Sequence, residues 1–268
     1  MRGPFLTFRE LGPHGLLANQ MFQVAATVGV ARRNGLDFVF PPWEPARRLL
    51  HRLPQVRKLP PDLPEIRERD FAYRDIRVER SATLLGYFQS EKYFADCRSE
   101  ILRLFAPQPE LVADLLRRFA AALGRPHCSL HVRRGDYVGS PYWADLAASD
   151  YYERAMARFD PDTGFLVFSD DINWCRGRFP GDRCELVDGL GAWESLVLMS
   201  LCRGHIIANS SFSWWGAWLD PDPGAMVIAP RAWFAGPYAD PDIPFSPGPP
   251  HRGFHDTRDV VPERWLRI

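Results

Sequence analysis

Apolar residues occur along the chain in short runs that alternate with helical repeats, which is the pattern of layered α/β structure. In the N-terminal part this pattern predicts strands and helices in the order Phe5–Phe8 (strand), Asn19–Arg33 (helix), Asp37–Phe40 (strand), Thr83–Tyr87 (strand) and Glu91–Leu104 (helix). The intervening stretch Pro41–Asp70 is rich in Pro and Arg and predicts no clear element.

A candidate linker, Ala106–Pro109, precedes a more regular alternation. Strands are predicted at Cys128–Arg133, Phe165–Ser169, Cys184–Val187, His205–Ala208 and Ala225–Ala229, with helices at Glu110–Leu123, Tyr151–Phe159, Trp193–Cys202 and Phe212–Leu219. We therefore expect two Rossmann-like halves facing a cleft, residues 1–107 and 108–268, with Pro237–Pro250 as a loop. In such folds, ligands bind outside the carboxyl ends of the strands.

Composition narrows the class of protein. The 33 basic and 33 acidic residues cancel, so nothing favours a nucleic-acid partner. The five cysteines are odd in number and include no CxxC pair, which argues against a disulfide framework or a structural zinc site. No apolar run is long enough for a signal peptide or a membrane-spanning helix. We expect a cytoplasmic protein with no integral membrane segment.

The first candidate site lies where the predicted strand Cys128–Arg133 ends. Arg133 and Arg134 are adjacent and are followed by a Gly turn, and guanidinium groups hold phosphate through a rigid fork. Strand alternation places His131 and Arg133 on one face and Arg134 on the other. We expect Arg133 to reach a ligand, and Arg134 to bind Asp136 or the other half of the protein. Local chemistry alone leaves a structural salt-bridge corner equally open.

A second site is predicted after the strand His205–Ala208, where Asn209, Ser210 and Ser211 precede an aromatic helix. Asn and Ser are favoured N-caps, and the start of a helix is a natural phosphate site. An ordinary capped core helix is the alternative. The helix carries three tryptophans at helical spacing, which we expect in the core: Trp214, Trp215 and Trp218.

Two carboxylates end another apolar strand. Asp170 and Asp171 follow Phe165–Ser169, where a carboxylate can accept hydrogen bonds from guanine or ribose or can cap a helix over Ile172–Arg176. One aspartate can serve each role. In the first half, Asn19 is expected at the start of the first helix, with its amide directed at a ligand.

No metal site is expected. The chain has three Asp-x-Asp triplets, but all are Asp-Pro-Asp, which is turn chemistry, and the seven histidines show no zinc spacing. The triplets are Asp160–Asp162, Asp220–Asp222 and Asp240–Asp242.

Together these segments resemble the family 11 fucosyltransferases, of the α-1,2-fucosyltransferase type. The resemblance rests on four motifs in the family's order: Asn19–Gln23, His131–Tyr137, Phe168–Asp171 and Asn209–Gly216. It covers most of the chain, from the first strand to about Phe234.

The resemblance implies a GT-B-like fold, GDP-fucose as donor, no metal or other cofactor, and inversion at the fucose anomeric carbon. It implies a galactose-containing glycan acceptor, with the galactose 2-OH as nucleophile. By resemblance, Arg133 contacts the β-phosphate, His131 lies beside the guanosine, Asn19 approaches the donor, and the backbone of Ser210, Ser211 and Phe212 cradles phosphate, with Arg134, Asp170 and Asn209 nearby.

The sequence departs from the family at Ala18, where the family usually has Gly. It also leaves the proton acceptor open, with Asp136 and Glu194 as carboxylate candidates. Two alternatives remain at this point. One is a fucosyltransferase of another linkage or acceptor, including protein O-fucosylation, and the other is a non-catalytic nucleotide- or glycan-binding relative.

Overall fold

The chain was analysed as a computed structural model, which describes residues 3–238 and 255–268. It forms two compact units. The N-terminal unit comprises Met1–Gln108 and Asp256–Pro262, and the C-terminal unit comprises Pro109–His255 and Glu263–Ile268. The expected triplet Asp240–Asp242 and most of the expected loop Pro237–Pro250 lie outside the described residues.

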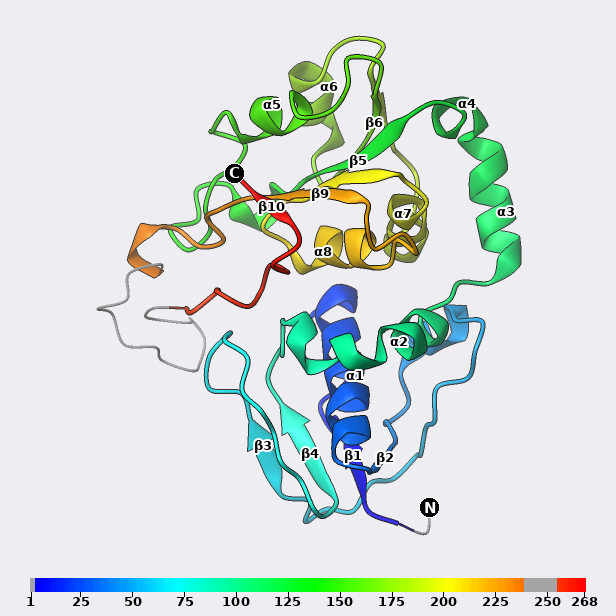
Figure 1. Cartoon of the computed structure of the whole chain (residues 1–268), viewed down its shortest axis with the longest axis vertical. Coiled ribbons are helices and arrows are strands. Elements are labelled where there is room, and N and C mark those ends of the chain that lie inside the picture. Colours follow the sequence, from blue (N-terminus) through cyan, green and yellow to red (C-terminus); the bar gives the residue numbers. More distant parts are fainter. Residues whose placement is uncertain (1–2, 239–254) are drawn as a thin grey trace. The chain divides into compact units, whose positions relative to one another are not determined.

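The N-terminal unit is built on a four-stranded parallel sheet with the strand order β2-β1-β4-β3 (Figure 1). Its strands are β1 (Phe5–Thr7), β2 (Asp37–Phe38), β3 (Glu65–Arg67) and β4 (Ala82–Leu85). Its helices are α1 (Leu17–Arg33) and α2 (Arg98–Leu104), with 3-10 turns η1 (Glu44–Arg48), η2 (Glu91–Tyr93) and η3 (Ala95–Cys97).

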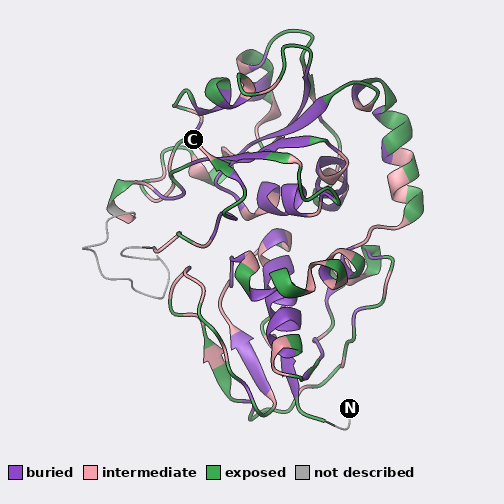
Figure 2. Cartoon of the chain, in the orientation of Figure 1, coloured by how far each residue is buried: buried purple, intermediate pink, exposed green. Residues whose placement is uncertain are grey.

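Helix α1 is the core of the N-terminal unit. Every residue from position 20 to position 31 is buried, and the helix is drawn almost wholly as buried in Figure 2. Small, apolar side chains make up most of this stretch, and its buried polar residues, Gln20, Gln23 and Thr27, each form a hydrogen bond. Charged residues occur only in the last turn, at Arg32 and Arg33.

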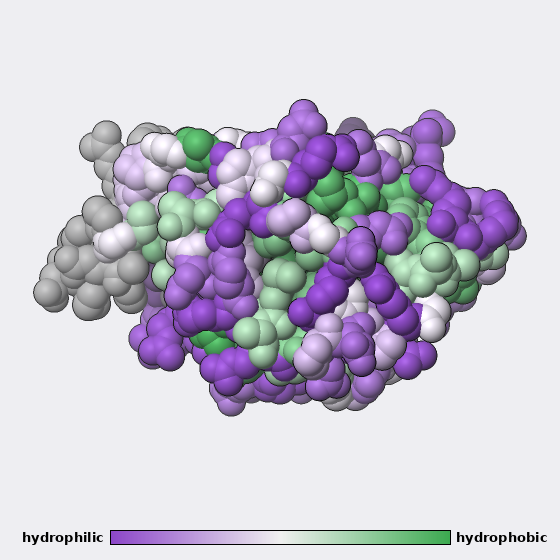
Figure 3. All heavy atoms as spheres, turned by 90° about the horizontal axis from the view of Figure 1, so that it is seen from above, coloured by the Kyte–Doolittle hydropathy of each residue, from purple (hydrophilic) through white to green (hydrophobic). Residues whose placement is uncertain are grey.

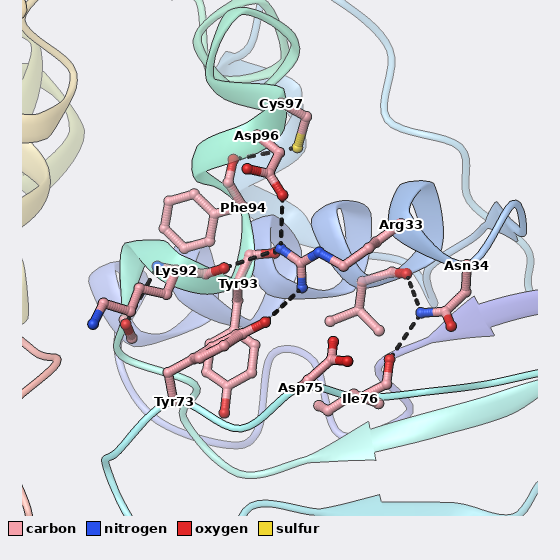
Figure 4. A network of polar contacts seen from close by, with 12 residues as sticks. Arg33, Asn34, Tyr73, Asp75, Ile76, Lys92, Tyr93, Phe94, Asp96 and Cys97 are labelled. Atoms are coloured by element: carbon pink, nitrogen blue, oxygen red, sulfur yellow. Dashed lines mark hydrogen bonds and ion pairs between the residues drawn. The ribbon is translucent and has the colours of Figure 1, made fainter.

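The carboxyl end of α1 is tied to the surrounding loops by the network in Figure 4. The Arg33 guanidinium donates to the Tyr73 hydroxyl at 3.2 Å and to the Lys92 carbonyl at 3.0 Å. The Asn34 amide donates to the carbonyls of Val30, at 2.8 Å, and Ile76, at 2.9 Å. These bonds satisfy the Val30 carbonyl in the last turn of α1 and attach that end of the helix to η2 and to the chain that leads to β4.

The C-terminal unit contains a six-stranded parallel sheet with the order β10-β9-β8-β5-β6-β7. Its strands are β5 (His127–Val132), β6 (Gly164–Ser169), β7 (Cys184–Leu186), β8 (Gly204–Ile206), β9 (Met226–Ala229) and β10 (Leu266–Arg267). Its helices are α3 (Pro109–Arg118), α4 (Ala120–Leu123), α5 (Tyr151–Met156), α6 (Ile172–Arg178), α7 (Ala192–Ser200) and α8 (Ser211–Trp218), with 3-10 turns η4 (Gly135–Tyr137) and η5 (Gly236–Tyr238). Helices α5 and α6 lie on one side of this sheet and α7 and α8 on the other (Figure 1).

Most predicted elements are present, and the differences have local causes. The single helix expected over Glu91–Leu104 is wrong: Phe94, with φ −143°, separates η2 from η3, and α2 begins only after Cys97, which adopts φ −118° and ψ 31°. Strand β3 was not predicted, because its residues show no apolar run and none is buried. Strand β10 has only two residues and was missed for the same lack of pattern.

The expected tryptophan core is confirmed. Trp214 and Trp215 have no exposed surface and Trp218 is 1% exposed, so the aromatic face of α8 is packing. Within the described ranges, no helix combines the length and apolar character needed to cross a bilayer. The face shown in Figure 3 is mostly hydrophilic, with hydrophobic residues visible between polar side chains.

The packing of α1 generates a stability prediction. A Cβ at Gly29 would overlap the Tyr93 carbonyl oxygen and would lie 2.7 Å from the Phe94 Cα, and backbone atoms there have little freedom to retreat. We expect Gly29→Ala to lower the free energy of unfolding by about 1–3 kcal/mol or more, measured by urea unfolding. Gly177→Ala in α6 is the matched control, since nothing lies within 4 Å of its added Cβ. That variant should be neutral or stabilised by up to about 1 kcal/mol, and equal effects at both positions would contradict the packing argument.

Candidate donor-binding site

The topology of the C-terminal unit marks one position on its sheet. From β5 the chain proceeds through β6 to β7 on one side, and it then returns to place β8 on the other side of β5. The strand order therefore reverses between β5 and β8. In open parallel sheets, the crevice outside the carboxyl ends of the strands at this switch point is the usual ligand site.

Arg133 lies at that position. All six residues of β5 are buried, and Arg133 is the first charged residue after them. Its guanidinium forms two ion pairs, from Nη2 to Asp136 Oδ1 at 2.5 Å and from Nη1 to Asp170 Oδ2 at 2.7 Å. The guanidinium also lies over the Tyr137 ring, 5.3 Å from its centroid. Arg133 is thus held in place from three directions.

Arg134 has different partners from those expected. It donates from Nε to Asp171 Oδ2 at 3.0 Å and lies 4.3 Å from the centre of the Trp174 ring. The expected pairing of Arg134 with Asp136 is therefore wrong, since Asp136 pairs with Arg133. The side chain of Arg134 is directed toward the start of α6, where Asp171 is the N-cap residue.

The two aspartates after β6 divide their roles as the sequence allowed. Asp171 caps α6 by accepting from the Trp174 N–H at 3.1 Å. This bond, reinforced by Arg134, lowers the pKa of Asp171. Asp170 instead accepts from the Arg134 N–H at 2.9 Å while it pairs with Arg133. The assignment of Asp170 to guanine or ribose stays a prediction.

His131 is buried beneath the site in its neutral form. Its Nδ1 lies 3.0 Å from Ser213 Oγ, which also accepts from the Ala208 N–H at 3.1 Å. Burial, together with the nearby Arg133 guanidinium, lowers the pKa of His131 to about 3. Ser213 was missed from the sequence, although a serine on the buried face of an aromatic helix was a usable signal.

The expected helix cap is confirmed at Ser210. Its hydroxyl accepts from the Phe212 N–H at 3.3 Å, and α8 begins at the next residue. Asn209 is 1% exposed, and its side-chain amide donates to the carbonyls of Ala144, at 3.0 Å, and Trp233, at 2.7 Å. Asn209 therefore anchors the turn through its side chain, and the backbone N–H groups of the first turn are the anion donors that this junction offers.

Aromatic residues connect these parts. Tyr137 stacks on Trp143 with ring centres 4.3 Å apart and an interplanar angle of 1°, and Trp143 stacks on Phe234 at 5.0 Å. The Tyr137 hydroxyl donates to the Asn209 carbonyl at 3.1 Å. The loop that carries Arg133 is thereby joined to the turn before α8. No sequence pattern had indicated this stack.

The remaining candidates lie elsewhere. Asn19 is in the first turn of α1, in the N-terminal unit, where its Oδ1 accepts from Gln89 Nε2 at 3.0 Å. Ala18, the departure from the family pattern, is 4% exposed. Glu194 lies in the first turn of α7.

The described residues include no cluster of three or more His, Cys, Asp or Glu arranged to hold a metal ion. Asp220 instead pairs with His205 at 3.0 Å and accepts from the Asp222 N–H at 2.8 Å, which is the turn chemistry expected of Asp-Pro-Asp.

Part of the stretch Pro41–Asp70, for which the sequence predicted no clear element, borders a pocket. An open pocket of about 600 Å³ in the N-terminal unit is lined by η1 and the chain on both sides of it. Its walls are anchored by Trp43, whose indole N–H donates to Gln20 Oε1 at 2.7 Å, and by Gln108, whose amide donates to the Leu49 carbonyl at 2.7 Å.

The environment of His131 predicts a pH response. Because its pKa is lowered to about 3, His131 binds fewer protons in the folded chain than in the unfolded chain between about pH 3 and the ordinary value of 6.5. Its contribution therefore makes stability rise with pH in that window, by at most about 1.4 kcal/mol per pH unit, and leaves it flat above. NMR should show no titration of the His131 ring between pH 5 and 8, with His131→Asn identifying the resonance. A midpoint near 6.5 would contradict this.

Comparisons with known proteins agree with the fold. NodZ alpha-1,6-fucosyltransferase, in a crystal soaked with GDP-fucose, superposes with a TM-score of 0.53 at 16% identity, covering 82% of this chain and 94% of NodZ. POFUT1 in complex with GDP-fucose superposes with a TM-score of 0.54 at 11% identity, covering 85% of this chain and 98% of that one. The expected GT-B-like α/β class is confirmed.

Curated relatives agree at the level of sequence. The O-antigen biosynthesis glycosyltransferase WbnK of Escherichia coli is 34% identical over 189 residues, 65% of this chain and 63% of WbnK. The alpha-1,2-colitosyltransferase of Escherichia coli is 31% identical over 208 residues, 71% of this chain and 64% of that protein. Galactoside alpha-(1,2)-fucosyltransferase 1 of Saimiri boliviensis boliviensis is 29% identical over 238 residues, 77% of this chain and 64% of that protein.

The chain thus spans a little less than two thirds of the length of these relatives. Residues 11–242 match the profile described as Glycosyl transferase family 11. This match covers most of the sequence, and the chain belongs to glycosyl transferase family 11.

Proposed function

We propose that this protein transfers fucose from GDP-fucose to a hydroxyl of a galactose-containing glycan, with inversion and without a metal. The observation that carries the proposal is the placement of Arg133 and the start of α8 on both sides of the β5/β8 switch point, in a chain of family 11. A helix start and an Arg guanidinium are both groups that bind the phosphates of a nucleoside diphosphate.

In this proposal the diphosphate of the donor binds Arg133 and the first backbone N–H groups of α8. Asp136 is the carboxylate that releases Arg133 to the diphosphate, because the Asp136 side chain is 66% exposed, whereas that of Asp170 is 26% exposed. Asp170 remains beside the guanidinium and keeps it aligned. His131 and Phe212, with ring centres 5.5 Å apart, form the wall beside which the guanosine binds.

Departure of GDP places negative charge on the β-phosphate and positive charge on the sugar. Donors that are already in position stabilise this charge without reorganisation, which is the task that a metal performs in other enzymes. The acceptor hydroxyl attacks from the opposite face of the sugar, which inverts the anomeric carbon. We assign the acceptor to the N-terminal unit and the donor to the C-terminal unit.

The relatives guide the choice of substrates. The similarity to a galactoside alpha-(1,2)-fucosyltransferase supports the galactose 2-OH as the nucleophile in this proposal. The similarity to WbnK, an O-antigen biosynthesis glycosyltransferase, supports a bacterial polysaccharide as the acceptor and, with it, the cytoplasmic location expected from the sequence. The similarity to the alpha-1,2-colitosyltransferase favours colitose as the second candidate sugar. A direct assay with both sugar nucleotides separates the two candidates.

The nucleotide preference can be tested by thermal shift with GDP, UDP, ADP and CDP, each with and without magnesium. We expect GDP alone to raise the melting temperature, because a ligand that binds only the folded state stabilises it by mass action. Magnesium and EDTA should change neither this shift nor the rate of transfer. Equal shifts with all four nucleotides, or activity abolished by EDTA, would contradict the proposal.

Arg133 should be essential for transfer and dispensable for folding. Its partners are partly exposed carboxylates, so Arg133→Ala leaves no fully buried unpaired charge. We expect transfer to fall by about 10²- to 10³-fold, as when one oxyanion donor is removed, with the circular dichroism spectrum unchanged. Arg154→Ala is the control, since Arg154 forms an exposed pair with Asp150 on α5. Near-normal turnover of the Arg133 variant would remove the anion-site assignment.

A further inference from the structure

The stretch of chain that follows β2 concentrates positive charge, which the rest of the sequence balances. Residues 44–58 include five Arg or Lys residues and one acidic residue, Glu44, whereas the whole chain has 33 basic and 33 acidic residues. This stretch contains η1 and supplies most of the lining of the pocket of about 600 Å³ in the N-terminal unit. The proposed donor site does not account for this local excess of charge.

Buried apolar side chains turn the basic side chains of this stretch outward. The side chains of Trp43, Leu49 and Leu53 are buried, and they hold the chain against the rest of the unit. Arg47 and Arg52 lie between them in the sequence, are exposed, and line the pocket. This division is expected, because burying an unpaired guanidinium is costly whereas burying an apolar side chain is favourable.

Backbone hydrogen bonds fix the path of the chain around the pocket. The Leu50 N–H donates to the Ala106 carbonyl at 2.8 Å, and the Val56 N–H donates to the Phe40 carbonyl at 2.9 Å. The backbone on which the basic side chains stand is therefore held on both sides. A ligand need not order this backbone when it binds, which favours affinity.

The basic side chains that line the pocket have no carboxylate partner. Arg32, in the same unit, pairs with Glu100 at 2.6 Å. In the part of the chain that the structure describes, no ion pair holds Arg47, His51 or Arg52. Positive groups gathered in one hollow repel one another and focus their field on it, so the pocket attracts an anion.

The other groups of the pocket suit a sugar. Arg binds carboxylate and phosphate oxygens through its rigid fork of N–H donors. Leu50 is 44% exposed and offers an apolar surface to the C–H groups of a ring, while Gln55 and Glu44 offer hydrogen-bonding groups to hydroxyls. A volume of about 600 Å³ is within the range of pockets that bind small ligands.

A membrane surface or a nucleic acid fits this surface less well. Segments that insert into a lipid interface are amphipathic helices with exposed apolar or aromatic side chains, whereas η1 has five residues and Trp43 is 3% exposed. Nucleic acids bind extended basic faces, and the charges of this chain cancel over its length. A compact anionic ligand is therefore favoured.

We propose that this pocket binds an anionic sugar, with Arg47 and Arg52 holding its carboxylate or phosphate group and His51 beside them. Every residue of the lining belongs to the N-terminal unit, so binding needs no group from the other unit. The identification of this sugar as an acidic residue of the glycan substrate rests on the proposed function.

Three sugars that differ only at carbon 6 test the pocket directly. Glucuronate carries a carboxylate there, glucose 6-phosphate carries a phosphate, and glucose carries a neutral hydroxyl. We expect at least one of the two anions to shift the NMR signals of the backbone amides of residues 44–55 in a saturable manner, and glucose to leave them unchanged. Added salt should weaken this binding, because it screens the charges of exposed side chains.

Substitutions test the side chains that the proposal names. Arg47→Gln and Arg52→Gln should each weaken binding of the sugar anion by about 5-fold, the upper range for an exposed ion pair, and the double variant should bind more weakly still. Arg57→Gln is the matched control and should bind like the wild type. Arg57 is an exposed basic residue of the same stretch that neither lines the pocket nor forms an ion pair within the described residues. All the variants should keep the wild-type melting temperature, since none of them breaks an ion pair.

The outcomes distinguish this proposal from the proposed function. Binding of glucuronate alone assigns the pocket to a carboxylate, and binding of glucose 6-phosphate alone assigns it to a phosphate. No saturable shift with either anion, equal weakening in Arg57→Gln, or binding of phosphatidylglycerol vesicles in place of both anions would overturn the assignment of the pocket and leave the proposed function intact. If a sugar anion binds but the wild type transfers fucose to no galactoside, the proposed function fails and the pocket keeps its ligand.

Discussion

The shared binding of Arg133 by Asp136 and Asp170 determines the form of the candidate donor site. Strands β5 and β6 pair in a register that ends with Val132 opposite Ser169. Beyond that pair, the ladder of backbone hydrogen bonds continues as side-chain ion pairs, Arg133 with Asp170 and Arg134 with Asp171. The buried strand stops where its charges begin, since a guanidinium is costly to bury without a partner.

This arrangement constrains the residues around it. A second positive charge beside Arg133 would oppose the first, and His131 is accordingly held neutral by burial and by its contact with Ser213. The site therefore presents one fixed guanidinium and the dipole of α8, and not a diffuse basic patch. Under the proposed function, this arrangement suits a compact anion such as a diphosphate better than an extended polyanion, in keeping with the balanced charge of the chain.

The sequence predicted the C-terminal unit well because the candidate site residues of that unit lie at the ends of strongly apolar strands. Alternation along β5 separated Arg133 from Arg134, and the cap at Ser210 followed from the residue types. The partner of Arg134 was mistaken because pairing of Arg133 with Asp170, and of Arg134 with Asp171, depends on the register between two strands. Register is a tertiary property that the pattern of one strand does not contain.

The N-terminal unit was harder to predict from the sequence. Its edge strand β3 has no buried residue, so neither the strand nor Glu68 at its end could be found from apolar periodicity. The Glu68 carboxylate accepts from the backbone N–H groups of Tyr87 and Phe88, and such partners leave no trace in the identity of neighbouring side chains.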